Sequence, residues 1–98
     1  MSEKLKLTRF DAAEFLSESE DQAELLSDAL SSGNAAYITH ALNIIARARG
    51  MSDLAKETGL NRSALYDALG PEGNPTLDTL LKVLAALKFQ ITGVQQAA

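Results

Sequence analysis

Four side chains that can form directional hydrogen bonds gather in residues 61–66. Arg62 is the most informative of them, because its guanidinium presents two parallel N–H donors that match the two acceptors on the edge of a guanine. Asn61 can bond to an adenine or a phosphate, and Ser63 can bond to a base or a phosphate. Tyr66 lies one helical turn after Arg62, so it is its neighbour on a helix, and it suits a phosphate or a thymine methyl group. The segment predicts a surface that contacts nucleic acid.

Two short helices must hold these side chains in place. A helix-turn-helix joins such helices at a steep angle through a turn of three or four residues. Ala55 provides the small residue that the helix crossing needs, and Gly59 accepts the left-handed conformation that the turn needs. The apolar residues expected to face inward are Leu54, Leu60, Ala64, Leu65, Ala68 and Leu69. The alternative is two ordinary core helices joined by a glycine turn, but the combined pattern over residues 51–70 favours the helix-turn-helix.

Charged residues flank this motif. Lys56, Arg47 and Arg49 are close enough in sequence to contact phosphates, although each can equally be a solvated surface residue. Asp67 would repel a phosphate, so it is expected either to accept from a cytosine amine or to form a local pair. We therefore take Asn61, Arg62, Ser63, Tyr66, Lys56 and Arg49 as the candidate DNA-binding residues.

The composition excludes several classes of function. The chain has 98 residues, a length typical of one domain, and a net charge of −4, which counts against a protein that simply coats DNA. It has no cysteine, which excludes disulfides and cysteine-ligated metals, and no apolar run near the roughly 18 residues that a membrane span needs. The first residues lack the apolar core of a signal peptide, so we expect a cytoplasmic protein.

Catalysis is not expected. The single histidine, His40, has no obvious acid or base partner, and no glycine-rich phosphate loop is present. We expect no catalytic residues, no metal site, no cofactor and no small-molecule ligand.

Acidic residues are concentrated in the first third of the chain. Residues 1–33 carry a net charge of −5, whereas residues 34–98 carry +1. One interpretation is a solvated acidic helix face; the other is a surface for a basic partner. The candidates for contacting such a partner are Glu18, Glu20, Asp21 and Glu24.

Helical periodicity and capping residues predict an all-α fold of five to six helices. Asn34, Asn61 and Thr76 are expected to cap helices, and a Ser19–Gln22 capping box is expected to start another. The expected helices cover about residues 11–16, 19–31, 34–49, 52–59, 61–69 and 76–87. They form a single domain with an acidic extension of two helices (1–33), a helix-turn-helix core (34–88) and a C-terminal strand or tail (89–98).

Two short extended segments are expected near the ends of the chain. Residues 4–8 and 89–92 alternate polar and apolar side chains, as strands do. Because a lone strand is not stable, residues 89–92 must pair either with residues 4–8 or with the same strand of a second copy.

The last helix carries more apolar residues than one packed face needs. Its expected core face comprises Leu77, Leu80, Leu81, Leu84 and Leu87. The apolar residues left over could form the interface of a dimer, which would present two recognition helices about one DNA turn apart. The residues expected to form this interface are Val83, Leu87, Phe89 and Ile91.

The sequence resembles the addiction-module antidote proteins, small antitoxins with a Cro/Xre-like helix-turn-helix. The resemblance covers about residues 5–92 and is carried by the segments FDAAEFL (10–16), IARARGM (45–51), LAKETGL (54–60) and LY (65–66). The most specific segment is PEGNPTLDTLLKVL (71–84). General helix-turn-helix similarity would cover only residues 51–69.

The resemblance implies two activities. Such antitoxins bind and block a small basic toxin, typically a relative of the RelE, ParE and HigB toxins. They also resemble repressors that bind the operator of their own operon, usually as homodimers. The alternative is a stand-alone helix-turn-helix repressor without a toxin partner, which would not need the acidic first third.

Overall fold

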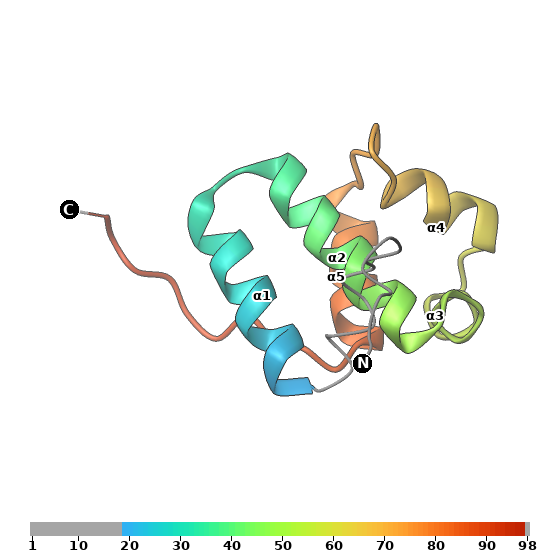
Figure 1. Ribbon diagram of the computed structural model, residues 1–98, viewed down its shortest axis with the longest axis horizontal. Helices are drawn as coiled ribbons and strands as arrows, with labels where there is room; N and C mark the ends of the chain where they lie inside the picture. The colour runs from blue at the N-terminus through green and yellow to red at the C-terminus, as the bar shows by residue number, and fades with distance from the viewer. Residues whose placement is uncertain (1–18, 98) are drawn as a thin grey trace, which may run out of the picture.

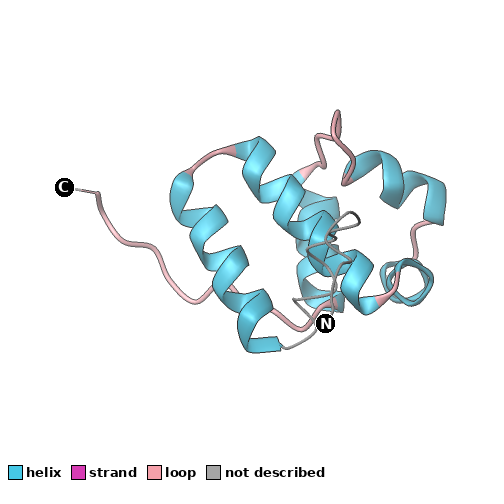
Figure 2. Ribbon diagram, viewed as in Figure 1, coloured by secondary structure: helices cyan, strands magenta, loops and turns pink. Residues whose placement is uncertain are grey.

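Five helices make up the regular structure of the computed structural model, which describes residues 19–97 (Figure 1). The helices are α1 (Ser19–Ser32), α2 (Ala35–Arg49), α3 (Met51–Thr58), α4 (Arg62–Ala68) and α5 (Leu77–Ala86). Residues 19–97 contain no strand (Figure 2), so this part of the chain is all-helical, as predicted. The expected strand at residues 4–8 and the helix at 11–16 lie outside the described residues.

Side-chain caps start three of the helices where the sequence predicts them. The side-chain oxygen of Asn34 accepts from the backbone N–H of Tyr37 at the start of α2. Thr76 accepts in the same way from Thr79 at the start of α5, and Asn61 caps α4. Each cap satisfies a backbone donor that has no partner inside the helix. The caps therefore determine where these helices begin.

Gly50 joins α2 directly to α3. It is the C-terminal cap of α2 and the N-terminal cap of α3, with φ 106° and ψ 116°. A side chain is strained at this φ, which explains the glycine. Helix α3 begins at Met51, so the prediction that Ser52 starts it was one residue late.

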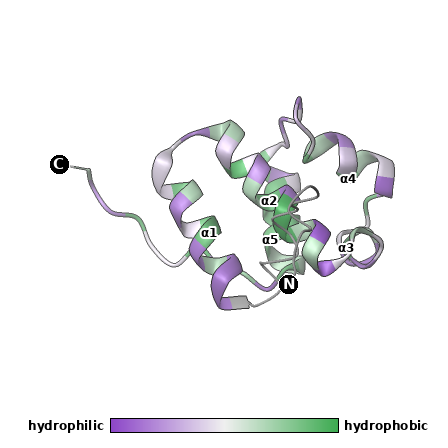
Figure 3. Ribbon diagram, in the orientation of Figure 1, coloured by the Kyte–Doolittle hydropathy of each residue, from purple (hydrophilic) through white to green (hydrophobic). Residues whose placement is uncertain are grey.

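The core lies between α2, α3 and the α4–α5 region. Leu42 and Ile45 of α2 and Leu65 of α4 are completely buried. Helix α3 packs against α2, α4 and α5, and α1 packs against α2. Apolar residues line the inner sides of α2 and α5, whereas the start of α1 is strongly hydrophilic (Figure 3). The core therefore holds the α3–α4 pair in a fixed place.

The predicted faces of α5 were partly wrong. Val83 and Leu87 are 0% and 2% exposed, so they belong to the core and cannot form a dimer surface. Leu77 and Leu81, predicted to be in the core, are 69% and 50% exposed. Only one side of α5 meets the other helices. That side carries the apolar residues that recur at helical spacing, which are Leu80, Val83, Leu84 and Leu87. On α4, Ala64 is likewise exposed rather than inward.

Of the two forms predicted for residues 89–98, a strand or a tail, the described chain shows the tail, because residues 89–97 form no strand. The N–H of Phe89 donates to the carbonyl of Leu84, and that of Lys88 donates to Ala85, with Lys88 at φ 67°. These two bonds form a Schellman motif, which ends α5 and turns the chain away. Residues 89–97, here called the tail, then run past α1 as a loop, and no strand lies beside them in the described chain (Figures 1 and 2).

Candidate functional site

The turn between α3 and α4 exposes the predicted nucleic-acid-contacting residues together. Gly59 has φ 79° and ψ 6°, the left-handed conformation expected of the turn. Leu65 is completely buried and anchors α4, so the opposite side of this short helix faces outward. The side chains that are exposed there are Asn61, Arg62, Ser63 and Tyr66, which we call the α4 face. The structure therefore brings these four predicted residues onto one short segment of surface.

Arg62 and Tyr66 contact each other on the α4 face. Nη2 of Arg62 lies 3.4 Å from the hydroxyl oxygen of Tyr66, and its guanidinium carbon lies 5.7 Å from the centre of the ring. This confirms the prediction that Tyr66 is the helix neighbour of Arg62. The contact limits the orientations of the guanidinium, which is the group best suited to bidentate recognition.

Asn61 uses its side-chain oxygen within its own helix. Oδ1 accepts from the backbone N–H of Ala64 at 2.7 Å, which is the capping bond of α4. The amide nitrogen Nδ2 is a donor and takes no part in this bond. Asn61 is therefore better placed to donate to a phosphate than to form the donor–acceptor pair that adenine requires.

Lys56 and Arg49, the two flanking cations among the candidate DNA-binding residues, lie in different environments. Lys56 is exposed on the last turn of α3. Arg49 is half-buried: its Nε donates to Oε1 of Gln22 at 2.8 Å, and its guanidinium carbon lies 5.5 Å from the centre of the Phe89 ring. Arg49 therefore links α2 to both α1 and the tail.

Sequence reasoning missed the role of Gln22. It is 0% exposed, because it lies one turn before Leu26 on the buried side of α1. The prediction treated it only as a capping residue. Its position in the buried row with Leu26 and Ala29 is the signal that could have identified it, since a buried amide requires hydrogen-bond partners.

One side-chain hydrogen bond ties the end of α4 to α2. Nδ2 of Asn43 donates to the carbonyl oxygen of Leu69 at 3.0 Å, just after α4 ends. The Oδ1 of the same Asn43 accepts from Nε of Arg47 at 3.0 Å. The first bond helps to position the end of α4, and the second orients the Asn43 side chain within α2.

Helix α1 presents an acidic face. Glu20, Asp21 and Glu24 are exposed, and these three residues are called the acidic face below. Glu18, the fourth predicted residue of this group, lies outside the described residues. With Asp28, α1 carries four acidic residues and no basic one. The acidic residues of α1 therefore lie on a folded, accessible surface.

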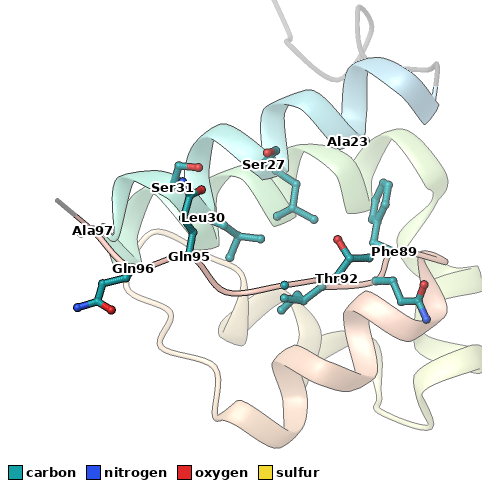
Figure 4. A pocket seen from close by; sticks show the side chains of 13 residues that line it. Ala23, Ser27, Leu30, Ser31, Phe89, Thr92, Gln95, Gln96 and Ala97 are labelled. Atoms are coloured by element: carbon teal, nitrogen blue, oxygen red, sulfur yellow. The ribbon is translucent and has the colours of Figure 1, made fainter.

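A groove runs beside the acidic face, between α1 and the tail (Figure 4). Its volume is about 760 Å³. Helix α1 contributes Ala23, Ser27 and Leu30, and the tail contributes Phe89 and Thr92, among others. Ala23 and Ser27 lie three positions after Glu20 and Glu24 and are therefore their neighbours on the helix, so the groove adjoins the acidic face.

A hydrogen bond joins the last part of α1 to the first turn of α2. The hydroxyl of Tyr37 donates to Oδ2 of Asp28 at 2.5 Å. This bond raises the pKa of Tyr37 above its ordinary value of 10.0, and burial and the negative charge of Asp28 act in the same direction. A raised folded-state pKa means that the stabilisation by this bond is present below about pH 10 and is lost as the pH rises through the folded-state value.

We expect the ultraviolet absorbance of the phenolates to show this shift. The chain has two tyrosines and no tryptophan, so the difference between wild type and Tyr37→Phe isolates the titration of Tyr37. Its midpoint should lie above 10.0, and Asp28→Asn should lower it. A Tyr37 midpoint that Asp28→Asn leaves unchanged would show that this hydrogen bond does not form in solution.

Three further observations on the described residues concern His40, metal binding and membrane spans. His40 is exposed on α2. Within residues 19–97, no three His, Cys, Asp or Glu side chains gather closely enough to hold a metal ion. No helix among the described residues combines the length and apolar character required to cross a membrane.

Comparison with known proteins shows what the sequence is similar to. A family model described as "Probable addiction module antidote protein" matches residues 6–95. A protein of Haemophilus influenzae strain Rd, described as an uncharacterized protein, is 44% identical over 97 residues, which cover 99% of this chain and 97% of the relative. No solved structure matches the chain.

Proposed function

Because this chain belongs to the family of probable addiction module antidote proteins, we propose that it is the antitoxin of a type II toxin–antitoxin module. It neutralises a small basic toxin by direct binding and represses its own operon through a Cro/Xre-like helix-turn-helix. Its role is binding rather than catalysis, and operator binding places it in the cytoplasm with the DNA. The observation that carries the proposal is the family match over residues 6–95, which spans both the acidic face and the α4 face.

The acidic face is the surface that we assign to the toxin, a relative of RelE, ParE or HigB. Glu20, Asp21 and Glu24 are exposed, and no basic residue of α1 neutralises them. Complementary charge accelerates association and selects the partner more than it adds affinity. The adjoining groove supplies apolar surface from Leu30 and Phe89, which the charges alone do not. Together they offer a basic protein both attraction and contact area.

Reversal of the acidic face is expected to weaken toxin binding without unfolding the chain. The variant Glu20→Lys, Asp21→Lys, Glu24→Lys should bind the small basic protein encoded next to this gene at least about tenfold more weakly, mainly through slower association. The measurement is association and dissociation at two salt concentrations, together with rescue of growth from the toxin.

A matched control reverses three exposed acids elsewhere: Asp53→Lys, Glu57→Lys and Glu72→Lys. It changes the net charge by the same amount, so its toxin binding should stay near that of wild type. Equal toxin binding by wild type and the α1 variant would mean that the acidic face is only solvated and that the toxin binds elsewhere.

The α4 face is the surface that we assign to operator DNA. Arg62, oriented by Tyr66, reads a base, while Asn61 and Ser63 contact phosphates or neighbouring bases. Lys56 supplies a flanking phosphate contact. Arg49, also a candidate for DNA contact from the sequence, bonds to Gln22 and packs on Phe89 instead, so its support of DNA binding is through the position of α2. A homodimer would apply two such faces to a palindromic site.

A further inference from the structure

The outer side of α5 carries two large apolar residues that the described chain leaves uncovered. Leu77 and Leu81 are 69% and 50% exposed and lie one helical turn apart, so their side chains are neighbours on one face. Ala85, one turn further on, is also exposed. The other large exposed hydrophobic residues of residues 19–97 are Tyr66, Ile91 and Val94, none of which has such a neighbour on its own helix. We call Leu77 and Leu81 the α5 seam.

One acidic and one basic residue lie beside the seam. Asp78 and Lys82 each follow one of the two leucines, and Nζ of Lys82 lies 3.0 Å from Oδ2 of Asp78. Both side chains are well exposed, so this pair contributes little to the stability of one chain. The same two charges can instead meet those of another helix.

The arrangement is complementary to itself when a second α5 runs antiparallel. A two-fold axis near the middle of the seam would place Leu77 against the partner's Leu81, and Asp78 against the partner's Lys82, twice each. A parallel two-fold pairing would place the charges of the two copies on opposite sides of the seam, so that Asp78 would not meet the partner's Lys82. Apolar contacts in the centre with opposite charges at the flank are the pattern by which paired helices select register and orientation.

We infer that the homodimer forms by antiparallel packing of α5 against α5 of a second copy through this seam. The inference rests on the proposed dimeric repressor and adds the interface that such a repressor needs. A second copy fits better than a basic toxin, because the acid and base beside the seam cancel and give a cationic protein no preference for this face. It also replaces the interface predicted from the sequence, because two residues of that interface, Val83 and Leu87, are buried within one chain.

Loss of the seam is expected to convert the dimer to a monomer. The variant Leu77→Glu, Leu81→Glu should have the mass of one chain by light scattering and sedimentation, at concentrations where the wild type has the mass of two. Both leucines are exposed, so the variant should keep its helical circular dichroism and melting temperature. Ile91→Glu, at a residue 55% exposed outside the seam, is the matched control and should remain dimeric.

Charge exchange tests the orientation of the helices. Asp78→Lys alone and Lys82→Asp alone should each weaken self-association at least about tenfold, because each dimer would oppose like charges. Mixed in equal amounts, the two variants should form a heterodimer, in which the introduced lysine faces the introduced aspartate. A role confined to the ion pair within one helix cannot produce this rescue, because that pair stays broken in both variants.

Three results would overturn the inference: a monomeric wild type, a seam variant that remains dimeric, or charge variants that fail to pair when mixed. None of them would count against the antitoxin proposal, because toxin and operator binding are measured separately. Conversely, a wild-type dimer that binds neither toxin nor operator would refute the proposed function and leave the interface intact.

Discussion

Arg62→Ala is expected to abolish sequence-specific operator binding while the helices stay intact. Arg62 is exposed at the first position of α4 and contributes nothing to the buried core, so its loss should not unfold the chain. A bidentate contact with a base is worth about 1–3 kcal/mol, and a dimer makes it twice, for about 2–6 kcal/mol per operator. Binding should weaken by roughly 30-fold or more, as measured by footprinting and by titration with operator DNA.

Two further variants separate base reading from charge. Arg62→Lys keeps the charge but loses the planar pair of donors, so it should lose discrimination between operator and random DNA while it retains salt-sensitive binding to both. Lys56→Ala should weaken binding to all DNA to a similar extent, as loss of a phosphate contact does. If Arg62→Ala still protects the operator from cleavage at wild-type concentrations, α4 is not the helix that reads it.

Gly73→Ala is expected to be the most destabilising of the single substitutions discussed, although the residue lies in an exposed connection. A Cβ atom at Gly73 would lie 2.2 Å from the carbonyl oxygen of Ala68 and 2.6 Å from its carbonyl carbon. Both atoms are backbone, so the connection between α4 and α5 must shift. Forced overlap of this kind costs about 1–3 kcal/mol. In a domain of this size, the melting temperature should fall by roughly 5–20 °C.

The matched control is Gly93→Ala, since a Cβ atom there would contact nothing within 4 Å. Its free energy of unfolding should stay within about 0.5 kcal/mol of wild type. Chemical denaturation of both variants gives the comparison. A Gly73→Ala protein as stable as Gly93→Ala would mean that the connection adjusts freely and does not fix the end of α4.

The helices could be predicted because their signals are local. Asn34, Asn61 and Thr76 cap helices through bonds to a residue three positions later, and such bonds depend on the chain only in their vicinity. Exposure of the α4 face followed from the same kind of signal, since Leu65 on the buried side directs Ser63 and Tyr66 away from the core, and Arg62 is at the first position of the helix. These parts of the candidate site needed no knowledge of the rest of the fold.

The errors arose where a distant partner decides the outcome. Apolar residues surround more than half of α5, and periodicity alone does not say that the helix packs on Val83 rather than on Leu77. Residues 89–92 alternate like a strand, but a strand needs a neighbour, and no strand lies beside them in the described chain. Arg49 meets Gln22 across 27 positions of sequence, a contact that spacing cannot show.

The joint at Gly50 restricts how chain length can change in this family. Because one residue separates α2 from α3, no loop there can absorb an insertion or deletion. One residue added within α2 would rotate α3 and α4 by about 100° relative to α1, since a helix turns once in 3.6 residues. The acidic face and the α4 face would then point in a new relative direction. Length variation among relatives is therefore expected in the tail, where it leaves the relation of these two faces unchanged.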